Sequence, residues 1–76
     1  MKFPIVNMRK TGQNICILRT ERGISVRDLS RMMGFSTPQA IYKCQHGRSL
    51  PTVDNLVALA AIFAVPIDAI LAIDAA

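Results

Sequence analysis

The chain has 76 residues and a net charge of +4, and 51% of its residues are hydrophobic while only 5% are aromatic. This length allows a single domain, and the aliphatic composition favours a small helical bundle over a β-sandwich. Two cysteines, Cys16 and Cys44, are too few for the disulfide framework of a small secreted protein and, with one histidine, too few for a metal site. We therefore expect a cytoplasmic protein, without metal or cofactor, whose thiols pack as small hydrophobic side chains.

The charges are unevenly distributed along the chain. Residues 1–50 hold all nine basic side chains and only two acidic ones, which gives this part a charge of +7. Residues 51–76 hold three aspartates and no basic side chain, which gives −3. The N-terminal part is therefore suited to contact with a polyanion, and the C-terminal part is not.

The first segment, residues 1–8, is predicted to be an extended arm, because Pro4 disfavours a helix there. We expect this arm to pack on the domain or on a second copy of the chain. Residues 9–76 are predicted to form a single domain, since no linker, low-complexity tract or repeat interrupts them.

The first helix is predicted at about residues 10–22. Its apolar positions include Ile15 and Leu18, which should point inward, and Gly12 permits close packing against a neighbouring element. Gly23 should end the helix as a C-terminal cap.

The second helix is predicted at about residues 25–33. Ser25 followed by Asp28 resembles a capping box, in which the serine hydroxyl accepts a bond from a free backbone N–H group. The inward face is formed by Val26, Leu29 and Met33. Gly34 should end this helix.

The third helix is predicted at about residues 37–46, with Ser36 or Thr37 as its N-cap and Pro38 in its first turn. The residues expected to face inward are Ala40, Ile41 and Cys44. The residues expected on the polar face are Gln39, Tyr42, Lys43 and His46. Gly47 should end the helix.

A fourth helix is predicted at about residues 52–64, with Thr52 as its N-cap, and a fifth at about 66–73, after the break at Pro66. The core face of the fourth helix is expected to consist of Val53, Leu56, Val57, Ala60 and Phe63. The tail from residue 56 onward is almost entirely apolar, but Pro66 and Asp68 interrupt it, so we expect no membrane span.

The segment most informative about function is residues 24–47. Two short capped helices around a glycine turn are typical of a helix-turn-helix unit, in which the second helix lies in the major groove of DNA. On that helix, Gln39 is suited to pair with adenine, and Lys43 is suited to donate to guanine O6 or N7. The methyl group of Thr37 or Ala40 is suited to contact a thymine methyl.

These elements together resemble the lambda-repressor-like (Cro/C1, XRE-type) helix-turn-helix domain over roughly residues 10–72. The matching motifs are LR at 18–19, RGIS at 22–25, Leu29, Gly34, Ile41, HG at 46–47, LP at 50–51 and the tail LVALAAIFAVPIDAIL. The resemblance implies an all-α, compact five-helix bundle that binds operator double-stranded DNA, often as a dimer. It implies a transcriptional regulator of the repressor type.

The resemblance also implies which residues contact DNA. In the family, the second helix touches backbone phosphate and the third reads base edges. The candidate DNA-binding residues carried over to this chain are Arg27, Ser36, Thr37, Gln39, Ala40, Lys43 and Arg48. Tyr42 is added from the exposed face of the third helix, with packing against the neighbouring loop as the alternative.

Three residues depart from the family pattern. Val26 stands where members often have a glutamine that touches phosphate, so we expect Arg27 to make the main phosphate contact of this helix instead. Cys44 stands where many close relatives have tryptophan, so a small thiol leaves room in the core or in a partner contact. Gln45 stands where members often have an acid that pairs with the arginine at position 19, so we expect at most a hydrogen bond to Arg19.

Two further expectations concern partners. A homodimer is expected through the N-terminal arm and the C-terminal helices, including Ile70, Leu71 and Ile73. The alternative to DNA binding is a protein-interaction or antitoxin-like module on the same scaffold, since fold does not fix function. No enzymatic activity and no small-molecule substrate are expected, because the sequence has no nucleophile–histidine spacing, phosphate-binding glycine loop or metal cluster.

Overall fold

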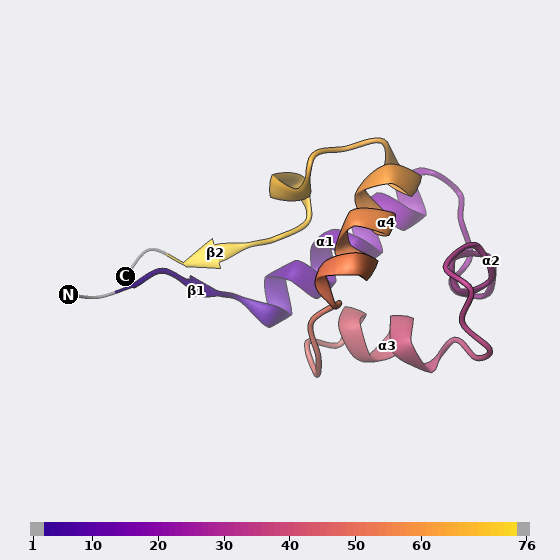
Figure 1. The fold of residues 1–76 in the computed structure, drawn as a ribbon, viewed down its shortest axis with the longest axis horizontal. Helices are drawn as coiled ribbons and strands as arrows, with labels where there is room; N and C mark the ends of the chain where they lie inside the picture. Colours follow the sequence, from indigo (N-terminus) through magenta and orange to yellow (C-terminus); the bar gives the residue numbers. More distant parts are fainter. Residues whose placement is uncertain (1–2, 75–76) are drawn as a thin grey trace.

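The computed structural model describes residues 3–74, which contain four α-helices, one turn of 3-10 helix and one two-stranded sheet. The elements in chain order are β1 (Ile5–Val6), α1 (Met8–Glu21), α2 (Val26–Met32), α3 (Gln39–Gln45), α4 (Val53–Phe63), η1 (Ile67–Ala69) and β2 (Ile73–Asp74). The antiparallel strands lie at one end of the molecule and α2 lies at the other (Figure 1). None of the helices in this part of the chain is long and apolar enough to cross a membrane.

The local signals at the helix ends are mostly confirmed. Ser25 and Thr52 are the N-caps of α2 and α4, and their hydroxyls accept bonds from backbone N–H groups three residues on, at 3.0 and 3.2 Å. Gly23, Gly34 and Gly47 have φ values of +65°, +76° and +71°, the left-handed conformation that lets a helix end in a tight turn.

Two helix starts differ from the prediction. Helix α1 begins at Met8, because the side chain of Asn7 accepts a bond from the Lys10 N–H at 2.9 Å and so caps it. Helix α3 has no side-chain cap, and Pro38 occupies its N-cap position, so the prediction of Ser36 or Thr37 as the cap is wrong. Both hydroxyl residues instead stay in the exposed turn before α3.

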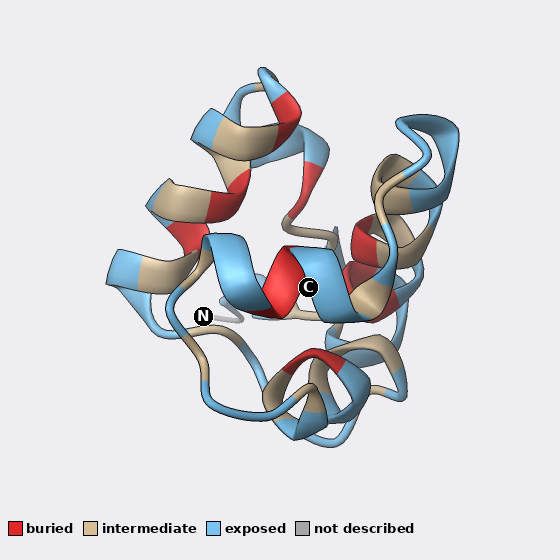
Figure 2. Cartoon of the chain, turned by 90° about the vertical axis from the view of Figure 1, so that its right-hand side faces the viewer, coloured by how far each residue is buried: buried red, intermediate tan, exposed pale blue. Residues whose placement is uncertain are grey.

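The core is formed by one buried cluster that draws on every α-helix and on the segment after η1 (Figure 2). Its members are Ile15, Leu29, Ile41, Leu56, Leu59, Phe63 and Ile70. The predicted core face of α4 was partly wrong, since Val53 is 77% exposed and Val57 52% exposed. The buried positions of α4 follow Leu56, Leu59 and Phe63, a stripe that passes beside the two valines.

Helices α1 and α3 approach each other closely at Gly12, as the sequence indicated. A Cβ atom built on Gly12 would collide with the carbonyl oxygen of Cys44 and would lie 2.8 Å from that of Gln45. Beside this contact the Arg19 Nε donates to Gln45 Oε1 at 2.9 Å, which confirms the expected hydrogen bond in place of an ion pair. The contact fixes α3, and thus its exposed face, against the longest helix of the domain.

The predicted fifth helix over residues 66–73 is wrong. After Pro66 the chain makes the single turn η1, and the segment from Ile70 to Ala72 is then held by α1. Asn14 Nδ2 donates to the Ile70 carbonyl at 3.0 Å, and the Ala72 N–H donates to the buried Thr11 hydroxyl at 3.0 Å. These bonds satisfy backbone groups that a helix would otherwise pair, so the chain continues as β2.

The N-terminal arm is extended in its described part, residues 3–7, and it pairs with the C-terminal end of the same chain. Ile5 lies opposite Asp74 and Val6 opposite Ile73, and the Asn7 N–H donates to the Ala72 carbonyl at 2.7 Å. The arm thus packs on its own domain, one of the two arrangements predicted. Residues 1 and 2 of the predicted arm lie outside the described residues.

Candidate nucleic-acid interface

Helices α2 and α3 are joined by a tight turn that sets the geometry of the candidate interface. Gly34 takes its left-handed conformation, and the backbone N–H of Phe35 donates to the Ser30 carbonyl at 2.9 Å. Leu29 on α2 and Ile41 on α3 are both buried in the core. These anchors leave the opposite faces of both helices exposed, as a helix-turn-helix unit requires.

A hollow of about 270 Å³ lies at this turn, and we name it the α2–α3 hollow. Its lining residues are Arg27, Ser30, Arg31, Phe35, Ser36, Thr37 and Pro38. Two arginines and three residues with hydroxyl side chains thus line one space. Such a set of donors suits a phosphate oxygen, which accepts several charge-assisted hydrogen bonds at once.

Ser30 is an unusual member of the hollow. It is 3% exposed, and its hydroxyl is the one buried side-chain polar atom of residues 3–74 without a hydrogen-bond partner. A buried hydroxyl without a partner costs free energy relative to a satisfied one. Ser30 thus lines the hollow and carries a hydroxyl whose hydrogen-bonding capacity is unused among residues 3–74.

The exposed face of α3 carries most of the other candidate residues. Gln39 and Lys43 are exposed one helical turn apart, and Ala40 between them is half-buried. The ring of Tyr42 stacks on His46, the C-cap of α3, with ring centroids 6.2 Å apart and planes inclined by 14°. Tyr42 is 42% exposed and does not line the α2–α3 hollow.

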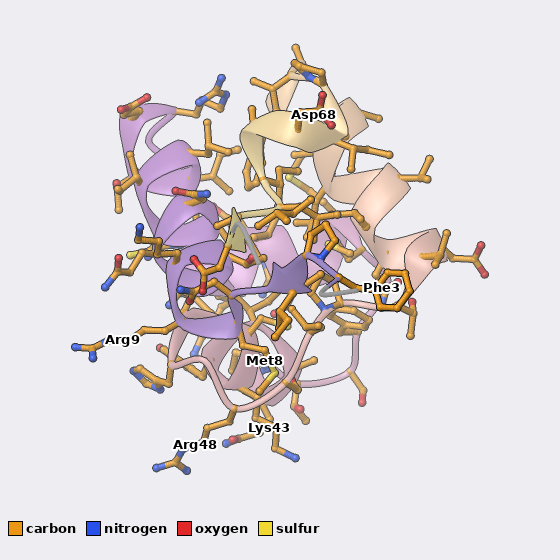
Figure 3. The ribbon with its side chains drawn as sticks, turned by 90° about the vertical axis from the view of Figure 1, so that its left-hand side faces the viewer. Phe3, Met8, Arg9, Lys43, Arg48 and Asp68 are labelled. Atoms are coloured by element: carbon orange, nitrogen blue, oxygen red, sulfur yellow. The ribbon has the colours of Figure 1, made fainter. Side chains whose placement is uncertain are left out.

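Arg48 follows α3 in the loop toward α4. Its backbone N–H donates to the Lys43 carbonyl at 2.9 Å, and both side chains point outward at the same edge of the molecule (Figure 3). Asp68 lies at the opposite end of that view. Of the three C-terminal aspartates, Asp68 thus lies well away from Lys43 and Arg48.

The cations of this face make no ion pair within the described part of the chain. The one ion pair of residues 3–74 joins Arg22 to Glu21 at 3.9 Å. Arg27, Arg31, Lys43 and Arg48 therefore have no carboxylate partner among residues 3–74. Their charges remain available for an anion, which makes this face a favourable surface for a polyanion.

The structure brings most of the predicted residues into two neighbouring groups. Arg27, Ser36 and Thr37 line the α2–α3 hollow, and Gln39, Ala40 and Lys43 follow on α3. Sequence reasoning missed Ser30 and Arg31 as members of the site. Arg31 could have been found, because it lies four residues after Arg27 and so shares its helix face, whereas nothing in the sequence marks Ser30.

Comparisons with known proteins agree with this geometry. The structure of the restriction-modification controller protein C.AhdI from Aeromonas hydrophila superposes with a TM-score of 0.75 at 22% identity, covering 83% of this chain and 94% of that one. The S. venezulae BldD DNA-binding domain gives 0.73 at 21%, covering 87% and 97%. The clp gene regulator ClgR from C. glutamicum gives 0.74 at 14%, covering 87% and 84%. At these identities the likeness concerns the fold.

The family assignment comes from the sequence comparison. No curated protein sequence matches the chain significantly. A family model described as helix-turn-helix matches residues 17–70, which include α2, the turn and α3 as well as the last part of α1 and all of α4. The chain therefore belongs to the Cro/C1-type (XRE) helix-turn-helix family.

Proposed function

We propose that this protein is a sequence-specific DNA-binding transcription regulator of the repressor type, which acts in the cytoplasm without catalysis and reads the major groove with α3. The observation that carries the proposal is the α2–α3 hollow, with its two arginines and the unpartnered Ser30 hydroxyl, beside the exposed polar row of α3. Family membership supports DNA as the partner. The solved relatives include a DNA-binding domain and a gene regulator, which agrees with this role.

In the proposed complex, the hollow holds a backbone phosphate. Arg27 and Arg31 supply charge, and the hydroxyls of Ser36 and Thr37 supply neutral donors. Arg48, at the far end of α3, contacts a second phosphate. Such contacts fix the register of α3 on the duplex and give most of the salt-sensitive affinity, but they do not distinguish sequences.

Base selection is assigned to the side chains of α3. Gln39 has a donor and an acceptor that match adenine, and Lys43 donates to guanine O6 or N7. Both are exposed on one face of a helix that packs closely on α1 at Gly12. The repressor type of action follows from the resemblance to Cro and C1 regulators.

Lys43→Ala is expected to reduce binding to a site selected from random duplexes and to relax the preference at one base position, by about 1–3 kcal/mol of discrimination. Fluorescence anisotropy with the selected duplex and its single-base variants measures both effects. Lys10→Ala removes the same charge from the exposed side of α1 and should leave the base preference unchanged. Equal affinity and equal preference in wild type and Lys43→Ala would contradict the assignment. A wild type without duplex binding at low salt would favour the protein-interaction module instead.

We also propose that the protein acts as a homodimer, because one α3 covers only a short site. The candidate surface is smaller than the sequence indicated, since Ile70 is fully buried in its own chain. The two-stranded sheet has unpaired edges, and Phe3, Ile5 and Ile73 beside them are 71%, 68% and 60% exposed. An isolated pair of strands is marginally stable, so pairing with a second copy would stabilise it.

The dimer is tested by sedimentation equilibrium at high micromolar concentration. We expect a mass of twice 8.3 kDa for the wild type and a shift toward 8.3 kDa for Ile73→Asp. The exposed Val57→Asp change on α4 serves as the matched control and should leave the mass unchanged. A wild type that sediments only as the monomer would exclude this interface.

A further inference from the structure

A second, larger cavity lies beside α3, with a volume of about 480 Å³, and we name it the α3–α4 cavity. Its floor includes Ile15, Ile41 and Leu59, which are 0%, 3% and 2% exposed. Its rim is formed by α3, the following loop at Ser49 and the beginning of α4. The cavity thus reaches from the core of the domain to the surface beside the proposed recognition helix.

The cavity exists because α3 presents small side chains toward it. Ala40 and Cys44 are half-buried there, four residues apart. Cys44 packs against the core cluster, and its thiol lies 3.8 Å from the Ser49 hydroxyl. Protein interiors are normally close-packed, and an unfilled volume destabilises a fold. A volume of this size with a mainly apolar lining is instead typical of small-molecule sites, which measure roughly 300–1,000 Å³.

The lining also indicates the chemistry of the ligand. Lys43 is the one charged residue among the lining residues, and no carboxylate is among them. Its exposed side chain points outward from the rim of the cavity (Figure 3). Met33 and Phe35 add a thioether and an aromatic ring, which make favourable contacts with another ring. The cavity could not be predicted from the sequence, because it forms only where Ile15 of α1 and Leu59 of α4 meet the residues around α3 in the folded chain.

We propose that the α3–α4 cavity binds a small aromatic carboxylate, whose ring fills the space beside Cys44 and whose carboxylate lies at the exposed rim, where the flexible Lys43 side chain turns to pair with it. This inference rests on the proposed function in one respect. Thr37, Gln39, Ala40 and Lys43 line the cavity and are also candidate DNA contacts, so the ligand and DNA compete for the same side chains. By linkage, the ligand weakens DNA binding as much as DNA weakens ligand binding.

The test uses 2-naphthoate as the probe and amide NMR spectra of the DNA-free protein as the measurement. Wild type should show saturable shifts at the lining residues, with weaker binding of the uncharged 2-naphthamide. Cys44→Met should bind 2-naphthoate at least about tenfold more weakly, because even one methylene in an apolar pocket changes affinity by that factor or more. Cys44→Phe should abolish binding. The matched control is Cys16→Met, which changes the other half-buried thiol, outside the cavity, and should bind as wild type does.

The outcomes separate this inference from the proposed function. An absence of saturable shifts in wild type overturns the ligand site, as does equal binding by wild type and Cys44→Phe. In a separate titration, 2-naphthoate should raise the apparent Kd of wild type for its selected duplex and leave that of Cys44→Phe unchanged. If no duplex binds at all, the proposed function is wrong. The titration of the DNA-free protein with 2-naphthoate still tests the ligand site independently.

Discussion

Gly12→Ala is expected to lower the free energy of unfolding by about 3 kcal/mol, at the upper end of typical overpacking effects. The added Cβ would collide with the Cys44 carbonyl oxygen and would lie 2.8 Å from the Gln45 carbonyl oxygen and 3.0 Å from the Gln45 carbonyl carbon. These are backbone atoms of α3, so no side chain can rotate away. The helices must separate, which disturbs the core cluster to which α1 contributes Ile15 and α3 contributes Ile41.

Urea unfolding measured by circular dichroism gives the size of this effect. Gly23→Ala is the matched control, because a Cβ there meets nothing within 4 Å and the cost comes only from its φ of +65°. That cost should be about 1 kcal/mol. If Gly12→Ala were no more destabilising than Gly23→Ala, α1 and α3 would not approach each other as described.

Replacing both arginines of the α2–α3 hollow by alanine is expected to weaken binding to every duplex, without a change in base preference. Arg27 and Arg31 line one space and have no carboxylate partner among residues 3–74. Both arginines are proposed to hold one phosphate, and each neutralised phosphate contributes about 1 to the slope of log K against log salt. The slope of the double variant should therefore decrease in magnitude by about 1. Anisotropy titrations at several salt concentrations measure the slope.

Ser30→Ala separates the role of the hollow from the role of net charge. The change removes a buried hydroxyl without a partner and leaves the charge unaltered, so the free protein should be as stable as wild type or more stable by about 1 kcal/mol. Duplex binding should nevertheless weaken on all sequences, because the phosphate proposed to lie in the hollow loses a hydroxyl donor. Two results together would contradict a phosphate in the hollow. These are wild-type affinity in Ser30→Ala and an unchanged salt slope in the arginine double variant.

Local signals predicted the parts of the fold that depend on neighbours in sequence. Helix caps and left-handed glycines depend on residues only a few positions apart, so they can be predicted from the sequence. Examples are the N-caps Ser25 and Thr52 and the three glycines that end α1, α2 and α3. The prediction of a helix after Pro66 is wrong, because the backbone of this segment bonds to the side chains of Thr11 and Asn14, about 60 residues away in sequence. Short apolar runs are ambiguous between helix and strand until such partners are known.

In the candidate site, too, features set by nearby residues could be predicted and features set by the folded arrangement could not. Gln39 and Lys43 could be placed on the exposed face of α3 from helical periodicity alone, and the structure leaves them exposed there. The α2–α3 hollow could not be predicted, since it depends on the turn that sets Ser36 and Thr37 beside Ser30 and the arginines. The absence of a side-chain cap on α3 also depends on that turn, which keeps both hydroxyl residues exposed.

The central claim, that α3 and the α2–α3 hollow together meet the duplex, is tested most directly by amide NMR of the wild type titrated with its selected duplex. We predict the largest shifts at Arg27, Arg31, residues 36–43 and Arg48, with β1, β2 and α4 little changed apart from the α4 residues next to α3. Shifts that instead centred on the exposed valines of α4 or on the two strands would contradict the claim.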